Sequence, residues 1–250
     1  MLLMYILFLG VLPAIIVIWF GTATVMRRLQ ERALTVRCAE KRAIVLSYDD
    51  GPGAILTEQL ADLLRRRNLL ATFFVIGQRA DQYSDHVAGL LRDGHDVGGH
   101  TQDHTNAWKV TPWRAVMDMR NGQATLRRLG VHPHLFRPPY GKATLATLIF
   151  GLVAKLHFAY WSVDTRDSWE KPRSIAAVLA MIKRQGGGVV LMHDCDAPPR
   201  SMNPQAHPRH ILALTEAIID FAATEGFSII RFSDLLRQAV AASSPGTVHV

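Results

Sequence analysis

The chain has 250 residues, of which 49% are hydrophobic, and it carries a formal net charge of +7 with a pI of about 9.8. This length and hydrophobic content predict one main globular domain with a sizeable core. We predict no nucleic-acid partner, because the basic residues lie in short runs typical of solvated helix faces, without interleaved aromatic residues. Attraction to anionic lipid headgroups is an alternative explanation of the excess positive charge.

The first 26 residues contain no charged side chain. A stretch of this length exceeds the roughly 20 apolar residues that cross a bilayer as a helix. The positive charges follow the stretch instead of preceding it, which favours an uncleaved anchor over a cleaved signal peptide. We therefore predict a single membrane-spanning helix over 1–26 and a basic juxtamembrane linker over 27–42. A buried core helix is the alternative.

Beyond this segment, short β-branched runs alternate with longer helix-period patterns. Strands are expected at 43–50, 69–77, 95–98, 134–136, 157–163, 188–192 and 227–232, and helices at 57–67, 86–92, 112–129, 143–154, 172–184 and 208–224. The alternation predicts βαβ units, a mainly parallel sheet and an α/β barrel of roughly seven strands. The domain is expected to span 43–238, with a tail at 239–250.

Conspicuous polar residues follow five of the expected strands. They are Asp49 and Asp50 after the first strand, and His100, Arg137, Asp164 and His193 after later ones. In α/β barrels the loops after the strands converge on one face, where the chemistry takes place. Polar turns would account for the aspartates, but they account poorly for arginine and histidine. We therefore expect a functional site at this face.

The motif HTQDH places His100 and His104 four residues apart. In a helix, residues at this spacing share one face, where two imidazoles could bind one metal ion. A carboxylate from another strand end would complete a site that leaves positions free for water and substrate. Asp49 and Asp50 are the candidates, because one could bind the metal while the other stays free as a base. A solvated acidic turn is the alternative.

The motif FRPPYG contains Arg137 and a turn that two prolines make rigid. Arginine can orient a carboxylate through paired hydrogen bonds. The backbone N–H of Tyr140 could donate to a developing oxyanion, which the prolines cannot do. At the end of the LMHD strand, protonated His193 could donate its proton to a leaving amine. A solvated proline turn and a structural histidine are the alternatives.

Taken in order, SYDDG, HTQDH, RPPYG, VDTRDSW and LMH resemble the five signature motifs of the polysaccharide deacetylase family, carbohydrate esterase family four. This family includes the chitooligosaccharide deacetylases of nodulation. The resemblance extends from Ala43 to about Leu236. It implies an α/β fold of the distorted (β/α)7 barrel type with mainly parallel strands, here preceded by the expected membrane helix.

The resemblance also implies a role for each matching residue. Asp49 looks like the family's catalytic base, and His193 looks like its general acid. Asp50, His100 and His104 look like its metal triad, which usually binds zinc, so we expect a divalent metal and zinc above others.

Three further positions complete the expected site. Arg137 resembles the arginine that positions the base, and Tyr140 resembles the residue whose backbone N–H holds the tetrahedral oxyanion. Leu191 resembles the residue that lines the acetyl pocket. We count Tyr140, Leu191 and Trp161 as the expected substrate-binding residues.

The fourth motif departs from the family's usual Asp-x-x-Asp-Trp, because Ser168 is inserted before Trp169. We predict that Asp167 is the partner of His193, with Asp164 as the second choice. The insertion leaves the role of Trp169 open.

These features predict metal-dependent hydrolysis of the N-acyl amide, expected to be N-acetyl, of an amino sugar in a polysaccharide or oligosaccharide. One alternative is a deacylase or deformylase of a lipid-linked amino sugar, and another is a catalytically silent carbohydrate-binding domain. The expected location is the bacterial cell membrane, with a single span. The basic residues after the span favour a cytoplasmic domain, whereas family members that act on peptidoglycan or exopolysaccharide work outside, so sidedness and oligomeric state stay open.

Overall fold

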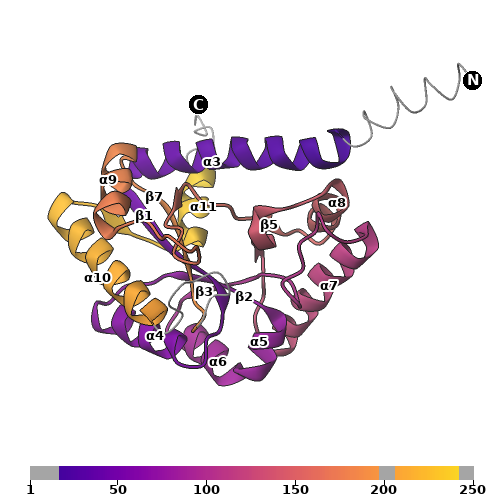
Figure 1. Cartoon of the computed structure of the whole chain (residues 1–250), viewed down its shortest axis with the longest axis horizontal. Helices are drawn as coiled ribbons and strands as arrows, with labels where there is room; N and C mark the ends of the chain where they lie inside the picture. The colour runs from indigo at the N-terminus through magenta and orange to yellow at the C-terminus, as the bar shows by residue number, and fades with distance from the viewer. Residues whose placement is uncertain (1–16, 197–205, 242–250) are drawn as a thin grey trace, which may run out of the picture.

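The computed structural model describes residues 17–196 and 206–241 (Figure 1). Its strands form one parallel sheet in the order β5-β4-β3-β2-β1-β7-β6, with β8 paired to β1. The strands are β1 (Ala43–Gly51), β2 (Thr72–Val75), β3 (Asp96–Gly99), β4 (Leu135–Phe136), β5 (His157–Phe158), β6 (Val163–Asp164), β7 (Gly188–His193) and β8 (Ser228–Ile229). The predicted α/β architecture with mainly parallel strands is confirmed.

Helices surround the sheet in Figure 1. They are η2 (Val17–Gly21), α3 (Thr22–Lys41), α4 (Leu56–Arg66), α5 (Gly77–Gln82), α6 (Ser84–Arg92), α7 (Pro112–Arg128), η3 (Pro139–Gly141), α8 (Leu145–Val153), α9 (Ile175–Gln185), α10 (His207–Glu225) and α11 (Phe232–Ala241). The short α5 was not predicted, and neither was α11. The expected strand over 227–232 is therefore shortened to β8, because the chain turns there into α11 and buries Phe232.

The strand expected at 157–163 is two strands that lie at opposite ends of the sheet. β5 pairs with β4, and β6 pairs with β7. The chain crosses between these two ends, so the sheet is a half-barrel whose end strands follow each other in sequence. The helix α3 bridges part of this crossing, because the Gln30 amide donates to the carbonyl of Phe158 and accepts from the N–H of Tyr160 at 3.3 Å.

The basic linker expected at 27–42 is not a linker in the structure. These residues belong almost entirely to α3, which buries Leu34 and Cys38 in one hydrophobic cluster with Val189 and Phe232. The basic residues of this segment suggested a linker, but Leu34 and Cys38 between them are buried. α3 is therefore part of the domain's packing.

Residues 1–16, which make up most of the predicted membrane anchor, lie outside the described residues. The rest of that anchor is η2 and the first residues of α3. Within the described ranges, none of the helices combines the length and apolar character needed to cross a membrane. Most of the expected tail, 242–250, also lies outside the described residues.

The alternation of side chains along β1 decides which residues reach the site. Ile44, Leu46 and Tyr48 point to the core under the surrounding helices. Val45 lies in the cluster on the other side of the sheet, which also holds Phe74. Because side chains alternate along a strand, Ser47 and Asp49 continue that second side.

The packing of α3 leads to a test of its structural role. Replacing the buried Leu34 by alanine should lower the free energy of unfolding by about 2–5 kcal/mol, because it leaves a cavity between α3 and the sheet. Val36→Ala is the matched control on the exposed side of the same helix, and its effect should stay within about 0.5 kcal/mol. Urea unfolding of the full chain in detergent measures both. Equal, small effects would contradict the packing of α3.

Candidate active site

The ends of neighbouring parallel strands bring the candidate residues together. In the register of β1 and β7, Asp49 lies opposite His193. His100 directly follows β3, and Arg137 directly follows β4. Because all these strands are parallel, their carboxyl ends lie at one edge of the sheet.

A bulge at the end of β1 lets two adjacent carboxylates serve one site. Neighbouring residues of a regular strand would point to opposite faces of the sheet. The pairing of β1 with β2 shifts register between Asp49 and Gly51, and Asp50 adopts a left-handed backbone with φ of 66°. Such bulges re-aim side chains near active sites, and aspartate tolerates this backbone conformation better than most residues. Asp49 and Asp50 can therefore both face the edge where the strands end.

Asp50, His100 and His104 form a cluster with the donor set of a metal site. Their ligand atoms all lie within 4.8 Å of one another. The Oδ1 atom of Asp50 is 3.3 Å from Nε2 of His100 and 3.0 Å from Nε2 of His104. Despite this proximity, the buried Oδ1 has no partner of proper hydrogen-bond geometry among the described residues. Two imidazole nitrogens and a carboxylate oxygen that converge in this way fit a divalent cation.

The charge state of Asp50 agrees with a ligand role. Burial raises the pKa of this carboxyl, but the nearby His100, His104 and His193 outweigh burial and hold the pKa well below its usual range. Asp50 is therefore ionised at neutral pH, as a metal ligand must be.

His100 is oriented through its second ring nitrogen. Its Nδ1 lies 2.7 Å from the backbone carbonyl oxygen of Arg137. That oxygen can only accept, so the contact places the proton on Nδ1 and leaves Nε2 free to bind a cation. Metal-binding histidines are commonly fixed by such a contact.

The HTQDH segment is a loop, whereas the spacing of its two histidines had suggested a helix. Thr101 and His104 both have left-handed backbones, with φ of 64° and 57°. The two imidazoles still meet, with ring centroids 5.0 Å apart. The loop achieves the convergence that a helical turn would have given.

Asp118 on α7 holds this loop, and sequence reasoning missed it. Its buried carboxylate accepts hydrogen bonds from the backbone N–H groups of Gln102, Asp103 and Thr105, at 3.2, 2.8 and 3.0 Å. A signal was available, because Asp118 lies one helical turn from the apolar Ala115 and shares the buried face of α7. A carboxylate on the inner face of an amphipathic helix calls for buried partners.

Arg137 is fully buried and holds Asp49. Its Nη1 donates to Oδ1 of Asp49 at 2.7 Å and to Oγ of Ser47 at 3.0 Å. Its Nε donates to the carbonyl of Ala159, and the guanidinium lies over the ring of Phe74 at 4.1 Å. Burial lowers the pKa of Arg137, and the charge of Asp49 opposes this effect. The contact occupies one carboxylate oxygen of Asp49 and leaves the other directed toward His100, 3.9 Å from its Nε2.

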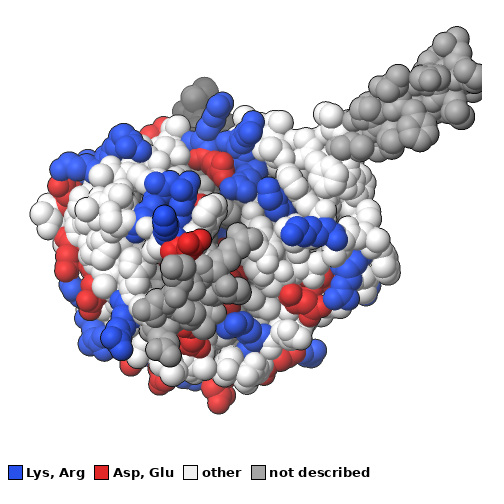
Figure 2. Space-filling view, in the orientation of Figure 1, with Lys and Arg blue, Asp and Glu red and all other residues white. Residues whose placement is uncertain are grey.

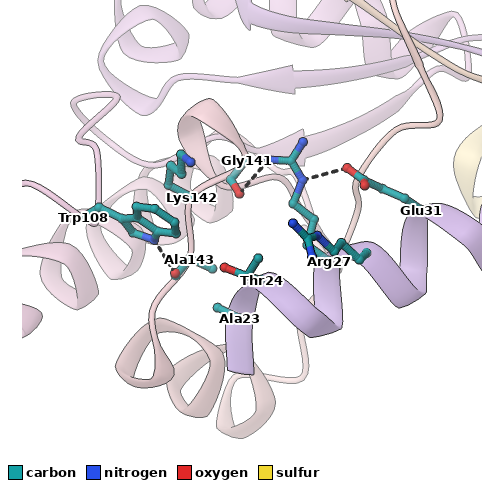
Figure 3. Close-up of a pocket in the computed structure, with 9 residues that line it drawn as sticks. Ala23, Thr24, Arg27, Glu31, Trp108, Gly141, Lys142 and Ala143 are labelled. Atoms are coloured by element: carbon teal, nitrogen blue, oxygen red, sulfur yellow. Dashed lines mark hydrogen bonds and ion pairs between the residues drawn. The ribbon is translucent and has the colours of Figure 1, made fainter. Parts of the chain in front are cut away.

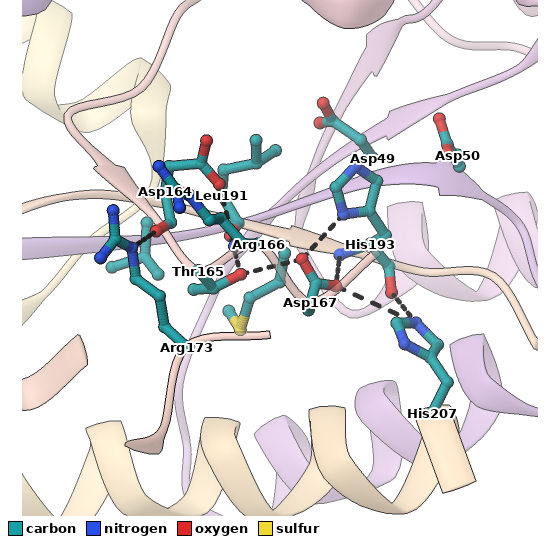
Figure 4. Close-up of polar contacts among 12 residues, drawn as sticks. Asp49, Asp50, Asp164, Thr165, Arg166, Asp167, Arg173, Leu191, His193 and His207 are labelled. Atoms are coloured by element: carbon teal, nitrogen blue, oxygen red, sulfur yellow. Dashed lines mark hydrogen bonds and ion pairs between the residues drawn. The ribbon is translucent and has the colours of Figure 1, made fainter. Parts of the chain in front are cut away.

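His193 is paired with Asp167 (Figure 4). Its Nδ1 lies 2.9 Å from Oδ1 of Asp167, and its backbone N–H donates to Oδ2 at 2.8 Å. Burial lowers the pKa of His193, but Asp167, together with Asp50 and Asp49, outweighs burial and raises the pKa to about 10. His193 is therefore protonated at neutral pH.

Asp164 does not take this place. Its carboxylate accepts from the backbone N–H of Arg166 at 2.9 Å, and its carbonyl accepts from the Arg173 side chain. Two further residues contact the Asp167–His193 pair and were not predicted. The hydroxyl of Thr165 lies 2.8 Å from Oδ1 of Asp167, and Nε2 of His207 lies 3.2 Å from the carbonyl oxygen of His193.

The expected substrate-binding residues have different environments. Tyr140 is half exposed, and its ring lies 4.7 Å from that of His104. Its backbone is left-handed, and its N–H has no hydrogen-bond acceptor among the described residues. Leu191 is buried on β7, and Trp161 packs under the guanidinium of Arg27 at 4.6 Å. Trp169 is half exposed, and its ring lies 5.1 Å from the guanidinium of Arg166.

The support of the histidine loop by Asp118 can be tested through metal affinity. Replacing Asp118 by alanine should weaken Zn²⁺ binding about 10- to 100-fold, because three loop N–H groups lose their acceptor. Asp103→Ala is the control in the same loop, since the Asp103 carboxylate bonds to Arg114 and not to the loop backbone. Competition with a chromophoric chelator measures both affinities. An unchanged affinity in Asp118→Ala would show that the loop is held without it.

Sequence comparisons agree with this geometry. A model of the polysaccharide deacetylase family matches residues 36–160. The chain is 30% identical over 200 residues to a peptidoglycan-N-acetylglucosamine deacetylase of Bacillus cereus, covering 79% of this chain and 89% of that protein. It is 32% identical over 158 residues to a chitooligosaccharide deacetylase of a Bradyrhizobium species, covering 61% and 71%.

Solved structures share the fold. A peptidoglycan N-acetylglucosamine deacetylase superposes with a TM-score of 0.67 at 26% identity, covering 79% of this chain and 89% of that one. A family 4 carbohydrate esterase from Streptomyces lividans, solved in complex with acetate, superposes with a TM-score of 0.61 at 28% identity, covering 74% and 91%. The chain belongs to the polysaccharide deacetylase family.

Proposed function

We propose that this protein is a metal-dependent hydrolase that removes the N-acetyl group from an amino sugar of an N-acetylated polysaccharide or oligosaccharide. One observation carries the proposal: an unpaired buried carboxylate oxygen faces two imidazoles, with a second carboxylate and a protonated histidine on the adjoining strand ends. Curated relatives named as deacetylases of peptidoglycan and of chitooligosaccharides support the substrate class.

The metal is part of the proposal. Asp50, His100 and His104 would hold a divalent cation, for which zinc is the expected choice from the donor set. Such a cation supplies Lewis-acid polarisation of the amide carbonyl and lowers the pKa of water.

The remaining steps belong to the protein's own groups. Asp49 accepts the proton of the attacking water, while Arg137 keeps its carboxylate in one orientation. The N–H of Tyr140 donates to the oxygen on which negative charge develops. His193, held by Asp167, gives its proton to the departing amine.

The separation of roles between Asp49 and Asp50 gives a direct test. Asp49→Asn should bind Zn²⁺ as tightly as the unchanged protein, because Asp49 is not a ligand. Its release of acetate from N-acetylglucosamine oligomers should fall about 10²- to 10⁴-fold, since the base is lost. Acetate assays and metal analysis of the same preparations provide both numbers.

Asp50→Asn is the matched control, and this variant should lose both metal and activity. A chelator should abolish acetate release by the unchanged protein, and added Zn²⁺ should restore it. Metal loss in Asp49→Asn would mean that the two roles are exchanged, and chelator-insensitive activity would exclude the metal mechanism.

The His193–Asp167 pair predicts a particular pH dependence. His193 acts in its protonated form, so kcat falls at alkaline pH as the imidazolium loses its proton. Asp167→Asn removes the nearest negative charge, which lowers the pKa of His193. The alkaline limb of kcat should therefore move to lower pH by about one unit or more. Asp164→Asn, which does not contact His193, should leave the limb in place. A limb that does not move in Asp167→Asn would exclude His193 as the acid.

A location at a membrane is also our proposal. Its support is the absence of charge in residues 1–26 and the position of the start of α3 near the catalytic edge of the sheet. A pocket between α3 and the loop over 141–143 favours the lipid-linked substrate.

A further inference from the structure

A pocket lies between α3 and the loop that follows Tyr140 (Figure 3). Its volume is about 220 Å³. It is lined by residues of the first half of α3, which include Arg27, Arg28 and Glu31, by Trp108 and by the loop over 141–143. The α3 residues of this lining precede the part of the chain that the family model matches.

The lining carries a net positive charge. Arg27 and Glu31 neutralise each other through an ion pair of 2.7 Å. Arg28 and Lys142 remain, and neither takes part in an ion pair with another described residue. The Lys142 ammonium lies 3.9 Å from the ring centroid of Trp108, whose indole N–H donates to the carbonyl of Ala143. The pocket therefore presents two cationic side chains, Arg28 and Lys142, that could bind an anionic group.

Only a short stretch of backbone separates this pocket from the cluster of Asp50, His100 and His104. The ring of Tyr140 contacts that of His104, and the next residue, Gly141, lines the pocket. Nη1 of Arg27 donates to the carbonyl of Gly141 at 3.2 Å, and its guanidinium lies over Trp161. A substrate bound at the metal cluster could therefore extend a neighbouring group into the pocket.

The direction of α3 brings its first residues close to the catalytic edge. Its last residue, Lys41, lies just before the start of β1, whereas Arg27 near its first residues contacts the loop after β4. α3 thus runs antiparallel to the strands, and its first residues lie near the catalytic edge of the sheet.

The surface beside the pocket is apolar and also basic. Val25 and Leu29, one turn apart on the outer side of α3, are 56% and 59% exposed. Leu152 and Val153 of the adjacent α8 are 79% and 76% exposed. Basic side chains gather along α3 at the top of Figure 2. Exposed apolar residues with interspersed basic ones are typical of surfaces that meet anionic lipid.

We propose that the pocket binds a phosphate group that links the amino sugar of the substrate to a lipid. The proposal rests on the proposed deacetylase function and specifies its substrate class as an N-acetylated sugar phosphate carried by a lipid. Arginine and lysine are the usual phosphate ligands. A volume of about 220 Å³ is below that of a drug-sized ligand site, so it suits a phosphate group better than an oligosaccharide.

The test compares kcat/KM of the full-length, zinc-loaded protein in detergent for three substrates. They are a neutral N-acetylglucosamine oligomer, soluble N-acetylglucosamine 1-phosphate, and the same sugar phosphate linked to a polyprenyl chain. The selectivity ratio is kcat/KM for a phosphorylated substrate divided by kcat/KM for the neutral oligomer. We expect a ratio above one for the lipid-linked substrate.

The double variant Arg28→Gln with Lys142→Gln should lower this selectivity ratio about tenfold, because two charged contacts to phosphate are lost. Lys142→Arg with Arg28 intact keeps both charges and should keep the ratio. Arg32→Gln is the matched control, an exposed arginine on α3 outside the pocket, and it should also keep the ratio. Thermal unfolding of each variant reports whether it is folded.

The outcomes separate the two proposals. If the double variant loses the phosphate preference while Lys142→Arg and Arg32→Gln keep it, the result supports phosphate binding in the pocket. Comparison of the soluble and the lipid-linked sugar phosphate then shows whether the lipid contributes. A ratio near one in the unchanged protein, or a preference that survives in the double variant, overturns the pocket while deacetylation of the oligomer upholds the function. No acetate release from any substrate overturns the function itself.

Discussion

The site depends on the hydrogen bonds of the buried Arg137 guanidinium. It ties the end of β1 to the backbone after β5 through Asp49 and Ala159, and its own carbonyl oxygen orients His100. One residue thus positions both the proposed base, Asp49, and a residue of the proposed metal site, His100. A buried charge of this kind is stable only while its partners stay in place. The geometry of β1, β4 and β5 is therefore coupled to the chemistry.

The like-charged neighbours Asp49 and Asp50 are accommodated by two different partners. Arg137 neutralises Asp49 from inside the half-barrel, whereas Asp50 faces two imidazoles and retains an unpaired oxygen. The bulge at the end of β1 makes this division possible, since it turns Asp50 away from the alternation of the strand. A cation at the cluster would complete the balance of charge.

Most of the helix α3 precedes the residues that the family model matches. It spans the crossing between β5 and β6, contributes Leu34 and Cys38 to the interior, and reaches the catalytic edge with Arg27. The same helix therefore packs in the interior of the domain and lines the pocket beside Gly141.

The sequence by itself determined the parallel α/β architecture and the identity of the residues at the strand ends, because periodicity and motif order are local properties of the chain. Tertiary structure decided the rest. The segment that holds Gln30 and Leu34 was predicted to be a linker, because Gln30 bonds to Tyr160, 130 positions away, and Leu34 packs in a cluster that includes Val189 and Phe232. The sequence ranked Asp167 above Asp164 as the partner of His193, and the structure places its carboxylate 2.9 Å from the ring. Periodicity indicates that Asp118 lies on the buried face of its helix, but only the fold shows which loop N–H groups it accepts from.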